Sequence, residues 1–278
     1  MKKIAVILLL IALFSTFCVS AVPQPPEGTF AEVSQALVFG GEDGMRYRLY
    51  VPADYEQVKY PIAVNLHGSG ERGTNNTAQL NNHFVTKLFN DYWERFPCIM
   101  LIPQCPNDVW WDPVTVMELI DSVAAEYNAD TDRIYLAGFS MGGYGIYDIL
   151  RMYPDRIAAA FPICGGNGYW DVEKFKDVPM WISHGELDAN VPVEDSRMLV
   201  EQLEALRAKS YIYTEIEGAS HFIWDRVYDY LEGYQWMFAQ NLNNRPKDMT
   251  TTHLMYCTAA AAVILAGIAI LVRKKKKQ

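Results

Sequence analysis

The stretch 136–145, "LAGFSMGGYG", carries one serine, Ser140, with a glycine two positions away on either side. An apolar run at 134–137 precedes it, and a helical pattern begins near Gly142. A serine at a sharp strand-to-helix turn, between glycines that let neighbouring chains approach, is exposed above the end of a sheet. The pattern therefore predicts a nucleophile, provided that the rest of the chain supplies a base, an acid and an oxyanion site.

Strands and helices alternate along the chain on both sides of this turn. An early hairpin is predicted at 36–52, and continuous apolar runs indicate strands covered on both faces at 60–68, 98–105, 132–140, 157–166 and 178–185, with a last short strand at 210–218. Helices are predicted at 81–92, 113–127, 142–152, 193–209 and 224–239. This order predicts an α/β fold with a doubly wound, mostly parallel sheet, in which ligands bind at the carboxyl ends of the strands. The segment 164–178 is too short to form a large cap domain.

A base and an acid follow the last two predicted strands. His221 lies in "EGASHFIW", and Asp188 lies in "WISHGELDANVP" with Glu186 and Asp195 as local competitors. The chain order is then nucleophile, acid, base, which is the order of one class of serine hydrolases and not of the others. We predict that His221 takes the proton of Ser140, and that Asp188 orients the imidazole and stabilises its charged form.

An oxyanion site needs backbone amides close to the nucleophile. One donor is expected to be the amide of Met141, the residue after the serine. The second is expected in the loop "LHGSGERG", from the amide of Ser69 or of Gly68. His67 is expected to shape this loop through hydrogen bonds, and His184 is expected to be structural.

Four side chains are candidate substrate contacts. Trp110 and Trp111 follow the fourth predicted strand, and they either stack on an aromatic acyl group or sugar ring or pack the rim of the site. Arg72 either braces the loop as an ion pair with Glu71 or binds a substrate carboxylate. Trp224 either forms a wall of the site or simply begins the last helix.

These motifs together resemble a known family. "NLHGSGERG", "PQCP" followed by "WWD", "GFSMGGYG", "PICGG", "HGELDANVP" and "GASHFIW" resemble the predicted-peptidase and carboxylesterase branch of the α/β-hydrolases, which is similar to secreted feruloyl and acetyl-xylan esterases. The resemblance covers about residues 45–239. It implies the α/β-hydrolase fold and ester hydrolysis through Ser140, Asp188 and His221, and it implies no metal and no organic cofactor.

The two ends of the chain predict a membrane topology. Residues 1–21 combine a basic start, a short apolar core and small residues before position 22, which is typical of a cleaved secretory signal; an uncleaved membrane helix is the alternative. Residues 254–272 carry no charge and would span about 28 Å as a helix, enough to cross a bilayer. Five cations follow directly, which favours a transmembrane helix over a buried core helix and places the tail in the cytoplasm. The expected parts are a signal peptide (1–21), a hydrolase domain (22–244), a linker (245–253), a transmembrane helix (254–272) and a basic cytoplasmic tail (273–278).

The net charge and the cysteine positions argue against a nucleic-acid partner and against disulfide bonds. The formal net charge of −9 argues against a nucleic-acid partner. Cys98 and Cys105 flank one strand, roughly 20 Å apart, and Cys105 and Cys164 end strands that two others should separate, roughly 14 Å apart. A disulfide requires Cα atoms within about 7 Å. We therefore expect free, mostly buried thiols.

The sequence thus predicts an exported, single-pass membrane protein with an extracytoplasmic catalytic domain. This domain would cleave carboxylic esters, acylated carbohydrates among them, through an acyl-enzyme. A serine oligopeptidase using the same triad is the first alternative. A non-catalytic surface-binding protein that keeps the hydrolase fold is the second.

Overall fold

The apolar runs of the sequence form the strands of one sheet. The structure is a computed structural model that describes residues 27–80, 82–166 and 171–244 of the 278-residue chain. The sheet has eight strands in the order β1-β2-β4-β3-β5-β6-β7-β8. They are β1 (Gln35–Phe39), β2 (Met45–Tyr50), β3 (Ile62–Leu66), β4 (Ile99–Gln104), β5 (Ile134–Phe139), β6 (Ala159–Ile163), β7 (Met180–Gly185) and β8 (Tyr211–Ile216). The pairs β1–β2 and β2–β4 are antiparallel, and all other neighbours are parallel.

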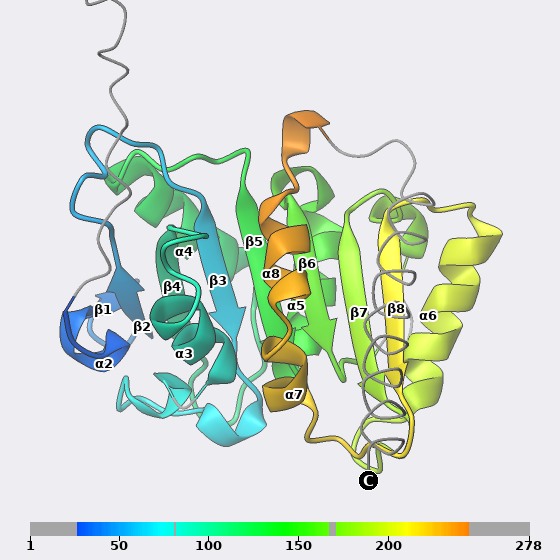
Figure 1. Cartoon of the computed structure of the whole chain (residues 1–278). Coiled ribbons are helices and arrows are strands. Elements are labelled where there is room, and N and C mark those ends of the chain that lie inside the picture. The colour runs from blue at the N-terminus through cyan, green and yellow to red at the C-terminus, as the bar shows by residue number, and fades with distance from the viewer. Residues whose placement is uncertain (1–26, 81, 167–170, 245–278) are drawn as a thin grey trace, which may run out of the picture.

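Helices cover both faces of the sheet (Figure 1). One buried apolar cluster joins the sheet to α4 (Pro113–Glu126), α5 (Met141–Met152) and α6 (Val193–Ala205). A second cluster lies on the other face, against α2 (Phe30–Val33), α3 (His83–Asn90), α7 (Trp224–Tyr228) and α8 (Leu231–Phe238). Along β5, Ile134 and Leu136 enter the first cluster, whereas Tyr135 and Ala137 enter the second. This alternation explains why a strand covered on both faces reads as an unbroken apolar run.

The doubly wound, mostly parallel sheet expected from the sequence is confirmed, as is the early antiparallel hairpin. One helix differs from the expectation, because the segment 224–239 forms two helices instead of one. The chain breaks at Tyr230, whose backbone is extended, and α8 then runs against the sheet. Gly233 lies so close to β6 there that an added Cβ would stand 2.8 Å from the Phe161 ring. The single helix was predicted from the local periodicity of the sequence. The contact of Gly233 with Phe161 depends on the position of the sheet, which that periodicity does not contain.

The parallel strands direct several loops to the same edge of the sheet, the lower edge in Figure 1. The loop after β3 forms the short helix η1 (Ser69–Glu71), β5 leads directly into α5, and the segments after β7 and β8 carry Asp188 and His221. Within the described part of the connection from β6 to β7, the only helix is η4 (Val172–Lys174). The remaining short helices are η2 (Ala78–Leu80), η3 (Pro154–Arg156) and η5 (Leu242–Asn244).

Candidate active site

Ser140 occupies the tight turn between β5 and α5. Its backbone has φ 52° and ψ −120°, a conformation that residues other than glycine adopt at a cost of about 1–3 kcal/mol. Its amide donates to the Ile163 carbonyl oxygen at 2.9 Å. A Cβ added at Gly138 would stand 2.7 Å from the carbonyl oxygen of Leu66, and one added at Gly142 would overlap the same oxygen. The two glycines of the motif are therefore required by the close approach of β3 to the turn.

The structure brings Ser140, His221 and Asp188 into one hydrogen-bonded row. Nε2 of His221 lies 2.9 Å from Oγ of Ser140, and Nδ1 of His221 lies 2.6 Å from Oδ2 of Asp188. Because a carboxylate only accepts, Nδ1 carries the proton, and Nε2 is left to accept the serine proton. His221 is 5% exposed and Asp188 is 9% exposed, so both groups lie below the surface beside a half-buried serine.

The surroundings of Asp188 keep its carboxylate ionised. Burial alone would raise the pKa of this carboxyl, but hydrogen bonds from His221 and from the backbone amides of Val191 and Asn190 outweigh that effect. The two amides donate to Oδ1 at 2.9 and 2.8 Å. The pKa of Asp188 therefore lies below its ordinary value, and the group carries a negative charge at neutral pH.

The loop after β3 is braced by His67. Nδ1 donates to the Gly68 carbonyl oxygen at 2.6 Å, and Nε2 accepts from the Cys105 amide at 2.9 Å. Complete burial lowers the pKa of His67 to about 4, so the imidazole is neutral at neutral pH. This confirms the expectation that His67 shapes the loop by hydrogen bonds. Gly68 approaches β5 so closely that an added Cβ would stand 2.6 Å from the Phe139 ring.

The expected oxyanion donors come from the start of α5 and from the loop after β3. Met141 is the first residue of α5, where a backbone amide has no carbonyl partner within its own helix. Ser69 begins η1, and Gly68 precedes it with an extended backbone. The Met141 side chain is buried, and its Sδ accepts from Nε of Arg72 at 3.2 Å, which connects the turn at Ser140 to the loop after β3.

The ion pair expected between Glu71 and Arg72 is not formed among the described residues, and that expectation is wrong. The short helix η1 directs the two side chains apart, so Arg72 faces Met141 while Glu71 lies 3.9 Å from Nδ1 of His67. Oε2 of Glu71 is buried without a hydrogen-bond partner in the described chain, and burial raises the pKa of this carboxyl. Arg72 thus has no carboxylate partner within the described residues.

The three tryptophans expected near the site have different environments. Trp110 is 59% exposed and makes an edge contact with Tyr144, one turn after Ser140 on α5. Trp111 is only 4% exposed, and its indole donates to the His67 carbonyl oxygen at 3.2 Å, which favours the packing alternative for this residue. Trp224 begins α7, stacks on Phe139 and meets the His221 ring edge-on at 5.6 Å, so it lies beside the base.

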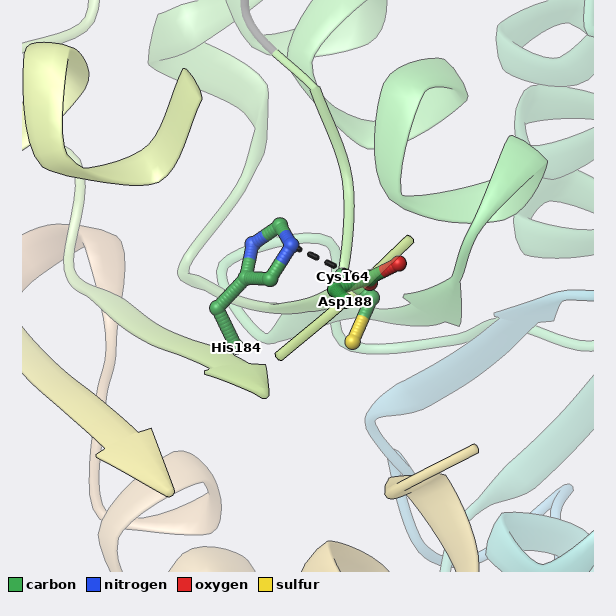
Figure 2. A group of neighbouring side chains, drawn as sticks. All are labelled: Cys164, His184 and Asp188. Atoms are coloured by element: carbon green, nitrogen blue, oxygen red, sulfur yellow. Dashed lines mark ion pairs between the residues drawn. The ribbon is translucent and has the colours of Figure 1, made fainter. Parts of the chain in front are cut away.

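A contact that sequence reasoning missed lies behind Asp188. Figure 2 shows the ring of His184, from the end of β7, directed at the carboxylate, with Cys164 beside it. Nε2 of His184 lies 3.2 Å from Oδ2 of Asp188, and all three groups are buried. The only signal in the sequence was the four-residue spacing of His184 and Asp188 in "HGELD", and this spacing alone does not predict a contact.

The chemistry of this cluster does not suit a metal ion. Ligand atoms of Cys164, His184 and Asp188 lie within 4.8 Å of one another. However, burial raises the pKa of the Cys164 thiol, and its Sγ lies 3.4 Å from the carbonyl oxygen of His221, so the sulfur is a protonated donor. Nε2 of His184 faces both a carbonyl and a carboxylate oxygen and must carry its proton. A cation would have to displace both protons.

A depression of about 460 Å³ lies elsewhere, at the amino ends of the parallel strands. Tyr60 and Pro61 before β3, Pro97 before β4 and Arg133 before β5 line it, together with Phe238 of α8. It is therefore separated from Ser140 by the length of the sheet. No cluster of nucleophile, base and acid lines it within the described residues, so the carboxyl edge remains the candidate site.

The expected signal peptide, linker, transmembrane helix and tail lie outside the described residues. Across the parts of the chain that the structure describes, no helix combines the length and the apolar character needed to cross a bilayer. The three cysteines of the domain, Cys98, Cys105 and Cys164, are free and buried, as expected.

Comparison with known proteins supports the fold. No family model matches the chain. It is 29% identical over 156 residues to a bifunctional acetylxylan esterase/xylanase of Neocallimastix patriciarum, covering 52% of this chain and 22% of that protein. It is 26% identical over 154 residues to feruloyl esterase B of Neurospora crassa, covering 50% of each. The chain thus spans between about a fifth and a half of the length of these curated relatives.

A solved structure gives a stronger match. A thermostable esterase is 36% identical with a TM-score of 0.71, over 76% of this chain and 64% of that one. The strand order of the sheet and the turn at Ser140 point to the same fold as these similarities do. By its fold and its similarity to acetylxylan and feruloyl esterases, the chain is identified as a member of the α/β-hydrolase superfamily.

Proposed function

We propose that this protein is a serine hydrolase that cleaves carboxylic esters through an acyl-enzyme. The observation that carries the proposal is the row of hydrogen bonds from Ser140 Oγ to His221 and from His221 to Asp188. A nucleophile, a base and an ionised orienting acid then share one edge of the sheet, where ligands of such folds bind. The similarity to esterases points to the same reaction class.

Acylation follows from this geometry. Ser140 Oγ attacks the ester carbonyl carbon while its proton moves to Nε2 of His221, and the carbonyl electron pair moves onto the oxygen. When the tetrahedral intermediate collapses, the bond to the alcohol oxygen breaks, and His221 returns the proton to the departing alcohol. Asp188 keeps the imidazole in the correct tautomer and stabilises its charge between these steps.

Deacylation repeats the sequence with water. His221 takes a proton from water as the water oxygen attacks the acyl-enzyme, and the proton then passes to Oγ of Ser140 as the acid product leaves. In both halves we assign the developing negative oxygen to the amide of Met141 and to that of Ser69 or Gly68. Losing one such donor typically costs about 10²–10³ in rate.

The substrate contacts are proposed from exposure and position. Trp110 lies against Tyr144 of α5, Trp224 lies beside His221, and Arg72 offers a cation without a carboxylate partner in the described chain. Trp111 has the weakest support, because its indole is committed to the loop after β3. Aromatic side chains near the serine turn suit a ring-bearing substrate such as an acylated carbohydrate or an aromatic acyl ester.

A covalent probe tests the enzyme class directly. The detergent-solubilised full chain is expected to react with a fluorophosphonate, and Ser140→Ala is expected not to react. Absence of labelling in the unmodified chain would favour the surface-binding alternative.

Asp188→Asn should lower kcat by roughly 10⁴ while leaving the fold intact. Full activity in that variant would show that another residue is the acid.

A substrate panel then separates the two enzymatic alternatives. We expect turnover of p-nitrophenyl esters and of methyl ferulate to exceed that of peptide anilides, because hydrolysis of an amide requires protonation of a poor leaving group. Faster turnover of the anilides would establish the oligopeptidase alternative. Ser140→Ala serves as the control for spontaneous hydrolysis of each substrate.

We also propose that the domain is displayed outside the cell on a C-terminal anchor. The support comes from sequence: the signal-like start, the uncharged run at 254–272 and the five cations after it. Deleting residues 254–278 is expected to release the esterase activity into the medium. Retention of the truncated protein inside the cell would contradict export, and its retention on the membrane would contradict the anchor.

A further inference from the structure

We infer that His184 is a positioning residue for Asp188, holding the carboxylate oxygen that orients the base. This inference rests on the proposed function, since it concerns the same triad. Nε2 of His184 lies 3.2 Å from Oδ2 of Asp188, the oxygen that also takes the Nδ1 proton of His221 at 2.6 Å. Figure 2 shows the imidazole meeting the carboxylate from the side of β7.

The protonation state of His184 follows from its neighbours. Nε2 lies 3.0 Å from the Val191 carbonyl oxygen as well as near Asp188, and neither oxygen can donate. Nε2 therefore carries the proton and donates it to the Val191 carbonyl oxygen, while the same N–H lies against the carboxylate of Asp188. In the neutral ring Nδ1 accepts, and the hydroxyl of Ser196 on α6 lies 2.7 Å away to donate to it. His184 and Ser196 are both buried, so water does not compete for these bonds.

The arrangement satisfies both oxygens of the acid. The Asn190 and Val191 amides donate to Oδ1, His221 donates to Oδ2, and Nε2 of His184 lies 3.2 Å from the same Oδ2. A carboxylate held by donors on both oxygens cannot rotate about its side-chain bond without losing one of them. His184 also binds the Val191 carbonyl oxygen, and it thereby ties the loop that contains Asp188 to the end of β7. Its hydrogen bond with Ser196 ties the same site to α6.

The environment of His184 contains few other charges. Cys164 lies on the β6 side and is protonated, because burial raises the pKa of its thiol. Glu215 of β8, the register partner of His184 on β7, forms an ion pair with Arg197 of α6. Asp188 is thus the charged group that His184 contacts directly among the described residues. Removing the imidazole N–H that lies 3.2 Å from Oδ2 would leave the charge of Asp188 to act more strongly on His221.

Two variants separate positioning from packing. His184→Leu removes the donor and keeps an apolar side chain in the buried site, whereas His184→Gln can place an amide N–H near the position of Nε2. For esters turned over by the wild-type full chain, we expect His184→Leu to lower kcat by about tenfold to a hundredfold per active site, with KM unchanged. We expect His184→Gln to recover most of that loss. Counting active sites with a fluorophosphonate removes any contribution from misfolded protein.

The pH profile provides a readout that a purely structural role would not move. Loss of the donor strengthens the interaction between Asp188 and the charged form of His221, so the acidic limb of kcat/KM should shift to higher pH in His184→Leu. A wild-type kcat per labelled site together with an unmoved acidic limb would overturn the inference while leaving the esterase proposal intact. Failure of the wild-type chain to label or to turn over esters would instead remove the proposed function.

A measurement on the wild-type chain covers the case in which His184→Leu does not fold. Selective ¹⁵N labelling of histidine should show a proton on Nε2 of His184. Comparison with His184→Gln assigns the signal. Finding Nε2 unprotonated would overturn the inference, because its lone pair would then face both the Val191 carbonyl oxygen and the Asp188 carboxylate.

Discussion

Replacing His67 with glutamine should remove a pH-dependent part of the folding free energy. In the folded chain the imidazole is completely buried, between the Gly68 carbonyl and the Cys105 amide, and burial lowers its pKa to about 4 from 6.5. Glutamine can still accept from the Cys105 amide but cannot take up a proton. The variant therefore isolates the titration of this one group.

The sign and the size follow from linkage. Because the pKa of the folded state lies below that of the unfolded chain, the unfolded chain binds more protons between these values, and stability falls as the pH falls from about 6.5 to about 4. The full difference corresponds to about 3 kcal/mol, of which about 2 kcal/mol is lost between pH 8 and pH 5. Carboxyl groups such as Asp188 add their own dependence, but they do so equally in both proteins.

Urea denaturation at pH 8, 7, 6 and 5 measures the effect. We expect the free energy of unfolding of the wild-type chain to fall by about 2 kcal/mol more than that of His67→Gln over this range. The absolute stability of the variant at pH 8 does not enter, since only the difference in slope is compared. Parallel pH dependences would refute the conclusion that His67 is held neutral by burial.

Three further predictions concern the turn, a helix cap and the thiols. Gly142→Ala should abolish fluorophosphonate labelling or unfold the chain, because its Cβ would overlap the Leu66 carbonyl oxygen; wild-type labelling would contradict the packing described for the turn. Asp112→Ala should lower the unfolding free energy by about 1 kcal/mol, since its carboxylate caps α4 by accepting from the Thr115 amide at 2.9 Å; an unchanged urea midpoint would show that the cap contributes nothing. A thiol reagent should leave the folded domain unmodified and react after denaturation, because its cysteines are buried and their thiol pKa values are raised; rapid reaction in native buffer would indicate local opening at Cys98, Cys105 or Cys164.

Much of the fold could be predicted because local patterns carry it. Continuous apolar runs mark strands covered on both faces, and β5 shows why, since its alternate residues enter opposite clusters. The break between α7 and α8 was missed because the approach of Gly233 to Phe161 has no local signature. Side-chain pairings depend on the same long-range geometry, and for this reason the predicted Glu71–Arg72 pair was wrong.

The sequence by itself determined the order of strands and helices, the position of Ser140 at a strand-to-helix turn, and the order in which Asp188 and His221 follow it. Composition, periodicity and spacing suffice for these features, because they are properties of neighbouring residues. Only the tertiary structure decided that Trp111 is buried under the loop after β3 and that His184 shares an oxygen of Asp188 with His221. Trp111 lies 44 residues from His67 and His221 lies 33 residues from Asp188. His184 is only four residues from Asp188, but their contact depends on how the loop after β7 folds back. In each case packing, and not the local sequence pattern, fixes the direction of the side chain.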